Sequence, residues 1–151
     1  MQKELKVSAI NNGTVIDHVP SNALFKVIHI LGLEKSDSQI TFGMNFESKL
    51  MGNKAIIKIS DRYFKDEDIN RITLVAPQAK LNIIKNYEVV EKRSVEVPDF
   101  IEGIAKCMNP KCVSNIENIQ SKFKVVAKDK VTLQCHYCER ITNQENITIK
   151  N

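Results

Sequence analysis

Four cysteines carry the clearest chemistry in the sequence, and all of them lie after residue 106. They are spaced as Cys-x4-Cys-x22-Cys-x2-Cys, at Cys107, Cys112, Cys135 and Cys138. Two close pairs separated by a hairpin-sized insert suit a tetrahedral Zn²⁺ site, because each tight turn aims two sulfurs at an ion about 2.3 Å away. Disulfides or four unrelated thiols are the alternative, and the paired spacing disfavours them. We therefore expect one zinc ion per chain.

The expected zinc is structural, because four sulfurs close its coordination shell, whereas a catalytic zinc keeps one position for water. The segment after Pro98 has only 53 residues, and a chain of that length buries too little apolar surface to fold comfortably alone. Metal binding would therefore supply part of its folding free energy. Aromatic residues near its basic residues are few, namely Phe123 and Tyr137, which favours docking on protein over base stacking.

The N-terminal part offers a second group of polar residues. Asp17 and His18 form either an acid–base pair or, as simple turn chemistry, a capping carboxylate beside an exposed imidazole. We expect residues 14–20 to be the loop between the first strand and the first helix, and such loops often bind ligands. Lys58 stands in an apolar strand, where it faces either an anion or solvent. Three further residues are ambiguous in the same way: Asn82, Tyr87 and Lys92.

Alternating strands and helices must position these side chains. Apolar alternation predicts a strand at 5–10, followed by a turn at Asn12-Gly13. Helical spacing predicts helices from about residue 21 to 31, ending at Gly32, and from Asp66 to the residue before Pro77. Further strands are predicted at 40–46, 55–59, 79–84 and 87–90, the last two joined by a turn at Lys85-Asn86. This order predicts a ferredoxin-like domain with one extra strand.

A change of composition divides the chain in two. The first hundred residues contain no cysteine, and 94–99, which includes Pro98, shows no helical period. We therefore predict an N-terminal domain at 1–97 and a small all-β zinc-binding domain at 98–151. The second domain is predicted to have strands at 123–126, 131–134 and 147–149. The whole chain then belongs to the α+β class.

Composition and charge limit the partners and the location. The chain has 151 residues, of which 42% are hydrophobic and 26% charged, as in an ordinary globular protein. Its net charge of +4 is modest, whereas a dedicated nucleic-acid binder carries a dense patch of positive charge. No apolar stretch approaches the ~20 residues that cross a bilayer, and MQKELKVSAINNG lacks the apolar core of a secretory signal. We expect a cytoplasmic protein that contacts neither membrane nor nucleic acid.

Several motifs, in the same order, resemble the regulatory chain of aspartate carbamoyltransferase, the allosteric partner of the first committed pyrimidine enzyme. They are GTVIDH at 13–18, MGNKAIIKI at 51–59, APQA at 76–79, NYEVV at 86–90 and the CMNPKC…CHYC zinc motif. The resemblance covers essentially the whole chain. It implies a non-catalytic subunit whose N-terminal domain binds CTP or ATP, with UTP acting alongside CTP in some members. It also implies a zinc domain that docks on the catalytic chain.

The same resemblance implies how the subunits assemble. In the family, two regulatory chains pair through their nucleotide domains, and six regulatory and six catalytic chains form the full complex. The residues at the turns of the zinc domain are candidates for the contact with the catalytic chain, namely Asn109, Glu139 and Arg140.

Individual residues of the nucleotide site also follow from the resemblance. Backbone groups of Ala9, Ile10 and Tyr87 would frame the base, whereas Asp17 and Lys58 would meet the ribose region.

On the same grounds, His18 and Lys92 would face the phosphates, and with Lys58 they supply the cationic groups that suit a triphosphate. Asn11 would belong to the site too, but it stands where the best-known member carries a lysine, so we expect altered selectivity for base or phosphate. The remaining lining residues would be Val7, Val15, Asn82, Ile84 and Val89.

Two other functions compete with this interpretation. A zinc-ribbon nucleic-acid binder would show a steep salt dependence of its affinity. A nucleotide-using enzyme would use Asp17 or His18 as a base, but the sequence has no Walker loop, no cluster of metal-binding carboxylates and no pattern of an activated nucleophile.

Overall fold

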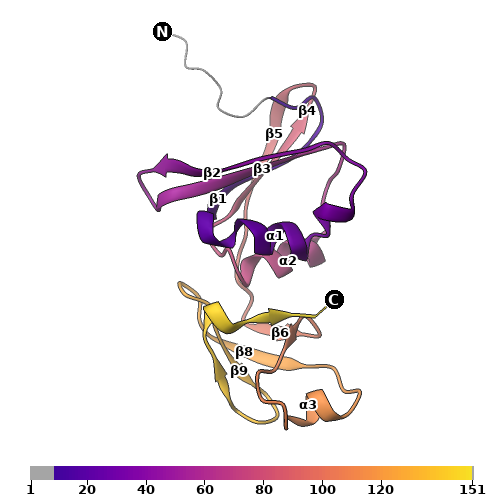
Figure 1. Cartoon of the computed structure of the whole chain (residues 1–151), viewed down its shortest axis with the longest axis vertical. Coiled ribbons are helices and arrows are strands. Elements are labelled where there is room, and N and C mark those ends of the chain that lie inside the picture. Colours follow the sequence, from indigo (N-terminus) through magenta and orange to yellow (C-terminus); the bar gives the residue numbers. More distant parts are fainter. Residues whose placement is uncertain (1–8, 151) are drawn as a thin grey trace.

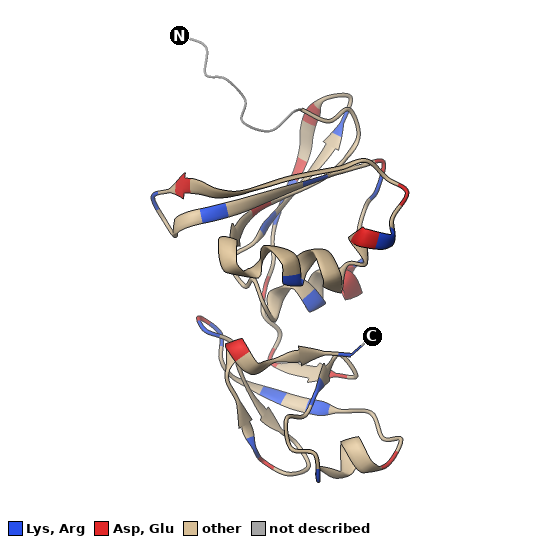
Figure 2. Cartoon of the chain, viewed as in Figure 1, with Lys and Arg blue, Asp and Glu red and all other residues tan. Residues whose placement is uncertain are grey.

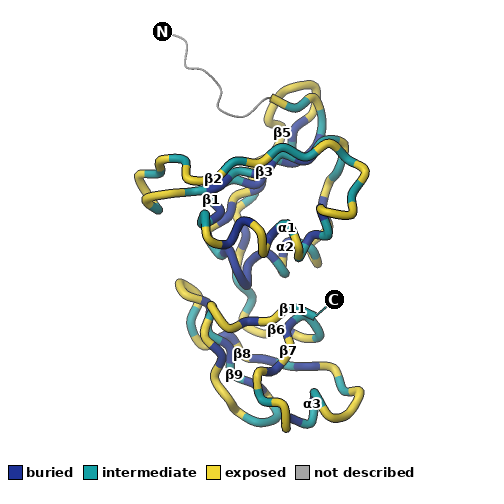
Figure 3. The backbone as a smooth tube through the Cα atoms, in the orientation of Figure 1, coloured by how far each residue is buried: buried dark blue, intermediate teal, exposed yellow. Residues whose placement is uncertain are grey.

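The structure is a computed structural model that describes residues 9–150. The chain forms two bodies, an N-terminal body with a sheet and two helices and a C-terminal body of short strands, joined by one connecting segment (Figure 1). Buried residues gather inside each body, and most of the loops at the periphery are exposed (Figure 3). Among the described residues, no helix is long and apolar enough to cross a membrane.

The N-terminal body has a five-stranded sheet in the order β2-β3-β1-β4-β5, with every neighbouring pair antiparallel. Two helices connect β1 to β2 and β3 to β4, so the element order is β-α-β-β-α-β with β5 added at one edge, which confirms the ferredoxin-like prediction. The strands are β1 (Gly13–Pro20), β2 (Ile40–Ser48), β3 (Gly52–Ser60), β4 (Lys80–Lys85) and β5 (Glu88–Ser94). The helices are α1 (Leu24–Ile30) and α2 (Asp66–Thr73), with short 3₁₀ turns at Ser21–Ala23 and Leu33–Lys35.

Among the described residues, the first strand lies later in the chain than predicted. Residues 14–20, expected as a loop, belong to β1 at the centre of the sheet, whereas Ala9 and Ile10 belong to no strand. The rest of the strand predicted at 5–10 lies outside the described residues. The adjacent polar pair Asp17-His18 suggested a loop, but β1 accommodates it with a bulge, at which His18 has a φ of 58° and the register with β3 shifts.

Helices α1 and α2 cover one face of the sheet. Ile16, Ile57 and Leu81 point to that face from three adjacent strands, and all are almost fully buried. The helices bring Leu24 and Ile72 to the same core. The alternate residues of each strand therefore lie on the opposite face, which we call the open face.

A close approach between strands and a tight hairpin turn shape the end of the sheet where β1 begins. Gly13 has a φ of +142°, and a Cβ there would overlap the carbonyl oxygen of Ile59, so only glycine fits this close approach of β1 to β3. The hairpin between β4 and β5 turns at Asn86 and Tyr87, whose φ values are 52° and 65°. Both central residues of a type I′ turn have positive φ. The turn is thus one residue later than predicted, and Tyr87 lies in it rather than in the strand.

The C-terminal body is built mainly from short strands. Its four-stranded sheet has the order β10-β9-β8-β6, and a separate two-stranded ladder pairs β7 with β11. The predicted hairpin at 123–134 is confirmed as β8 and β9, and the last predicted strand as β11. The strands are β6 (Phe100–Glu102), β7 (Ala105–Lys106), β8 (Lys122–Ala127), β9 (Thr132–Cys135), β10 (Ile141–Thr142) and β11 (Thr148–Ile149), with α3 (Val113–Ile116) and a 3₁₀ turn at Gln144–Asn146.

The two bodies have separate cores with one shared feature. Leu74 follows α2 in the N-terminal body, yet it belongs to the apolar cluster of the C-terminal body, with Ile101, Phe123 and Leu133. It is fully buried. The end of α2 is thus packed into the neighbouring body. The domain boundary proposed at residues 97 and 98 stays a prediction.

Candidate metal centre and ligand-binding face

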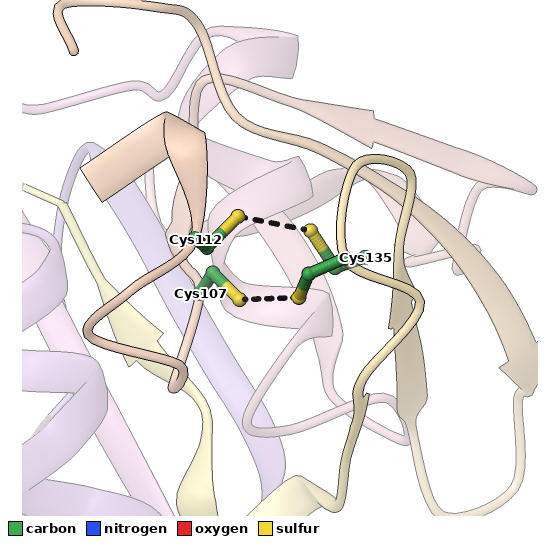
Figure 4. Close-up of side chains that lie close together, drawn as sticks. Cys107, Cys112 and Cys135 are labelled. Atoms are coloured by element: carbon green, nitrogen blue, oxygen red, sulfur yellow. Dashed lines mark hydrogen bonds between the residues drawn. The ribbon is translucent and has the colours of Figure 1, made fainter. Parts of the chain in front are cut away.

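The four predicted cysteines meet at one point of the C-terminal body (Figure 4). The sulfurs of Cys107 and Cys138 are 3.6 Å apart, as are those of Cys112 and Cys135, and all four lie within 4.8 Å of one another. Four sulfurs at about 2.3 Å from a tetrahedral ion are about 3.8 Å apart, whereas a disulfide has sulfurs at about 2.05 Å. The spacing and the donors therefore fit one tetrahedral ion bound by four thiolates.

Local hydrogen bonds shape the first cysteine pair. The backbone N–H of Cys112 donates to the carbonyl of Asn109 over 3.0 Å, which closes the turn. The side chain of Asn115 donates to the carbonyls of Cys107 and Asn109 over 2.9 and 2.7 Å. Asn115 thus locks the turn from α3, a role for which the cysteine spacing gave no signal.

The second pair sits on an equally tight turn. The N–H of Glu139 donates to the carbonyl of Cys135 and that of Cys135 to the carbonyl of Arg140, both over 3.0 Å. Glu139 has a φ of 65°, which lets the chain reverse directly after Cys138. The two turns are held by backbone bonds on different elements, and the β8–β9 hairpin brings them together.

Burial and hydrogen bonding shift the pKa of three of these thiols in different directions. Burial raises the pKa of the Cys107 thiol to about 12 and also raises that of Cys135. Burial opposes ionisation of Cys138 as well, but hydrogen bonds from the backbone of Arg140 and the side chain of Asn109 outweigh it and lower its pKa to about 7. Full ionisation of this cluster near neutral pH therefore needs the charge of a bound cation.

A second candidate site lies on the open face of the N-terminal sheet. Strand register places Lys58 of β3 beside Val15 of β1, Val15 beside Asn82 of β4, and Asn82 beside Lys92 of β5. One row across four strands therefore begins and ends with a lysine. The register also places Ile84 beside Val89 on this face, one row nearer the β4–β5 turn. Burial lowers the pKa of Lys58, which is consistent with its place in the middle of the sheet.

Asp17 and its neighbours form a polar cluster further along the open face. The Asp17 carboxylate accepts from Lys54 Nζ at 3.0 Å (Oδ1) and 3.2 Å (Oδ2), and its Oδ1 also accepts from the backbone N–H of His18 at 2.6 Å. The His18 Nδ1 lies 3.5 Å from Asp17 Oδ2. Lys54 was not predicted, although its spacing of four residues from Lys58 on one strand places both on the same face.

A polar pocket of about 570 Å³ opens at the end of the sheet where β1 begins. The N–H of Tyr87 donates to the carbonyl of Asn11 over 2.9 Å, which ties the β4–β5 turn to the segment before β1. Thr41 and Ser60 border both the pocket and the open face. The full lining is Ala9, Ile10, Asn11, Asn12, Asp37, Ser38, Gln39, Thr41, Ser60, Asp61 and Tyr87.

Both halves of the chain match models of known domains. Residues 5–96 match the allosteric domain of the aspartate carbamoyltransferase regulatory chain, and residues 99–148 match the metal binding domain of the same chain. The chain belongs to the aspartate carbamoyltransferase regulatory chain family.

Individual relatives carry the same description over nearly their full length. The aspartate carbamoyltransferase regulatory chain of Parabacteroides distasonis is 54% identical over 149 residues, which cover 99% of this chain and 97% of that one. The regulatory chain of Bacteroides fragilis is 53% identical over 148 residues, or 98% and 97% of the two chains. That of Thermococcus sibiricus is 52% identical over 149 residues, or 99% and 98%. This protein is therefore a regulatory, non-catalytic chain with a metal-binding domain.

The predicted nucleotide residues of this regulatory chain fall into two groups. Four of them line the pocket: Ala9, Ile10, Asn11 and Tyr87. Eight lie in β1, β3, β4 and β5, most of them on the open face: Val15, Asp17, His18, Lys58, Asn82, Ile84, Val89 and Lys92. The remaining one, Val7, lies outside the described residues.

Sequence reasoning missed several residues that the fold brings to the same region. Asn12 accepts two hydrogen bonds beside the pocket. Its backbone carbonyl accepts from the N–H of Asp61 at 2.9 Å, and its side-chain oxygen accepts from the N–H of Asn86 at 3.2 Å. Asp37 and Gln39 reach the pocket from the segment before β2. These residues are far apart in the sequence, and no local pattern connects them.

Proposed function

We propose that this regulatory chain binds CTP or ATP, with UTP as a further ligand alongside CTP, and passes the effect to an aspartate carbamoyltransferase catalytic chain. Residues 1–97 would form the nucleotide-binding domain, and residues 98–151 a zinc domain that contacts the catalytic chain. The observation that carries the proposal is the row from Lys58 to Lys92 across the open face, next to the polar pocket.

Charge supports one orientation of the nucleotide. Among the residues that line the pocket there is no lysine or arginine, but there are two carboxylates, those of Asp37 and Asp61. A triphosphate would be repelled there, whereas a base fits a pocket with many hydrogen-bonding groups. The phosphates would lie toward Lys58 and Lys92, whose charges suit them. The ribose would then lie between the pocket and the lysine row, next to Lys58, whereas Asp17, which we expected beside the ribose, lies on the far side of that row.

The distance between Lys58 and Lys92 across the open face suits a polyphosphate. Lys58 and Lys92 are separated by three strand spacings, or about 14 Å. Two long lysine side chains that reached inward from the ends of this row would enclose the polyphosphate between them. The short side chains of Val15 and Asn82 leave room above the middle of the row. His18 would add a third cationic group beside Asp17.

Calorimetric titration with CTP and ATP tests the nucleotide site. We expect Lys92→Ala to weaken binding by about 1.5–3 kcal/mol, the range for a hydrogen bond to a charged group. Lys26→Ala is the matched control, because Lys26 is an exposed lysine of α1 on the layer away from the open face. Unchanged affinity in Lys92→Ala would remove this residue from the site.

Zinc is the proposed ion of the metal centre. Four cysteine thiolates in a closed tetrahedral set are typical of structural zinc, and the set leaves no position for a catalytic water. The ion would therefore stabilise the C-terminal body and take no part in a reaction. Elemental analysis of the freshly isolated chain should find one zinc per chain; another metal, or sulfurs joined as disulfides, would contradict this assignment.

Leu74 supports a route for the allosteric signal. Its side chain follows α2 of the N-terminal body and is buried in the core of the C-terminal body. A nucleotide that shifts the sheet against α2 would move this contact, provided that it binds the two states of the complex with different affinity. The movement would reach the catalytic chain through contacts at the cysteine turns, where Asn109, Glu139 and Arg140 lie.

The edge strand β2 supports pairing with a second regulatory chain. β2 has nine residues and ends the sheet, so one side of its backbone lacks a partner strand in the described chain. Exposed apolar side chains accompany it: Phe42, Met44 and, on α1, Phe25, whose ring lies 6.1 Å from that of Phe42. A second copy that pairs along β2 would cover them.

The full complex would contain six regulatory and six catalytic chains. It would be located in the cytoplasm, where reducing conditions keep the thiols available for metal.

A further inference from the structure

The outer face of the four-stranded sheet in the C-terminal body carries an unusual mixture of side chains. Register places Phe100 beside Lys124, Lys124 beside Gln134, and Gln134 beside Ile141, so one row crosses all four strands. Phe100 is 67% exposed and Ile141 49% exposed, at the two ends of the row. A solvated face of an antiparallel sheet is normally polar. Large exposed apolar side chains at both edges instead indicate an interaction surface.

A groove of about 440 Å³ hollows this outer face. Its rim carries both signs of charge, because Lys122 lies directly beside Glu102 and Lys124 lies in the next row. Figure 2 shows basic positions on β8, and the strand sequence KFKVVA identifies them as Lys122 and Lys124. Phosphates of a nucleic acid would meet the carboxylates of Glu102 and Glu139 on the same rim. Mixed charge around an aromatic anchor suits a protein surface instead.

The groove is continuous with the metal centre. Glu139 and His136, which belong to the second cysteine turn, line the groove together with Phe100. The two cysteine turns, 107–112 and 135–140, comprise twelve residues. A stable protein interface takes about 20–30 residues and about 800 Å² from each partner. The turns alone are too small for a stable contact, and the outer face is the adjoining surface that supplies the missing area.

We propose that the catalytic chain covers the outer face as well as the cysteine turns, with Phe100 inserted into it as the apolar anchor and Lys122, Lys124 and Glu102 paired with its charges. This inference rests on the proposed function, because it names the surface that serves the proposed partner. It adds that the contact extends along the sheet from Glu139 of the second cysteine turn to Phe100 of β6.

Titration of the full-length chain against the catalytic chain tests this inference, with affinity measured by interferometry or calorimetry. We expect Phe100→Glu to raise the Kd at least about tenfold, as loss of an aromatic anchor does, and Lys124→Glu to raise it as well. Val90→Glu is the matched control, since Val90 is 54% exposed but lies on β5 of the other body. Metal content and circular dichroism of each variant confirm that it is folded.

The outcomes separate the inference from the proposed function. If Arg140→Glu prevents assembly while Phe100→Glu and Lys124→Glu assemble with unchanged affinity, the outer face is not part of the contact and the inference is overturned. If the unaltered chain does not bind the catalytic chain at all, the proposed function itself fails. If Phe100→Glu and Lys124→Glu weaken binding and Val90→Glu does not, the extended contact is supported.

Discussion

Truncation of Leu74 should show whether the packing between the two bodies carries the nucleotide signal as well as contributing to stability. Leu74 is fully buried in the core of the C-terminal body although it follows α2 of the other body. Replacing a buried leucine by alanine costs about 2–5 kcal/mol, because the cavity that remains closes only partly. We expect Leu74→Ala to lower the free energy of unfolding by an amount in this range. We also expect it to loosen the packing between the two bodies, so that thermal unfolding separates into two transitions.

The decisive assay is the nucleotide response of the complex with the catalytic chain. Leu74→Ala should retain the calorimetric affinity for CTP and ATP, because Leu74 is buried in the other body and does not line the pocket. It should nevertheless reduce the change in activity that these nucleotides cause. Leu24→Ala is the matched control, since Leu24 is equally buried but belongs only to the core of the N-terminal body. Leu74→Met serves if the alanine variant is too unstable, because it keeps the volume and alters the shape.

One result would refute this reasoning. If Leu74→Ala is destabilised as expected while the nucleotide response of the complex keeps its full size, the contact at Leu74 does not carry the signal. A loss of response in Leu24→Ala as large as that in Leu74→Ala would also contradict the account, because general destabilisation would then explain both.

Removal of the metal by chelators or mercurials should unfold the C-terminal body and release the catalytic chain. Acidification should have the same effect, because protons compete with the metal for the thiolates. Size-exclusion chromatography measures the release, and an intact metal-free complex would contradict the account. Cys135→Ser should abolish assembly yet leave calorimetric nucleotide binding largely unchanged, because Cys135 belongs to the core of the C-terminal body, whereas the proposed nucleotide site lies in the N-terminal body. Loss of nucleotide binding would argue against independent bodies. Gly13→Ala should lower the free energy of unfolding by about 2 kcal/mol or more, because the new Cβ meets the Ile59 carbonyl at a strained φ, as urea denaturation would show; wild-type stability would mean that β1 and β3 separate easily.

Much of the fold follows from local signals in the sequence. The helix at 24–30 has its apolar residues at helical spacing and stops at Gly32, which takes the left-handed conformation with a φ of 65°. The cysteine pairs mark the metal centre because their spacing encodes the geometry directly. In each case the signal and the structure lie within a few residues of one another.

Other parts could not be derived locally. The central strand β1 contains Asp17 and His18, which resemble a turn, and only the bulge and the partner Lys54 from β3 make this polar pair compatible with a strand. Tyr87 has strand-like character, but the hairpin register places it in the turn. Leu74 looks like an ordinary core residue of its own helix, and its burial in the other body depends on how the two bodies pack.

The central claim is that this chain makes a catalytic chain responsive to nucleotides. The most direct measurement is the activity of the catalytic chain at subsaturating aspartate, with CTP or ATP titrated in the presence and in the absence of this chain. We expect nucleotides to change the activity of the complex and to leave that of the catalytic chain alone unaffected. A complex that assembles with its metal in place but shows the same activity at every nucleotide concentration would contradict the account.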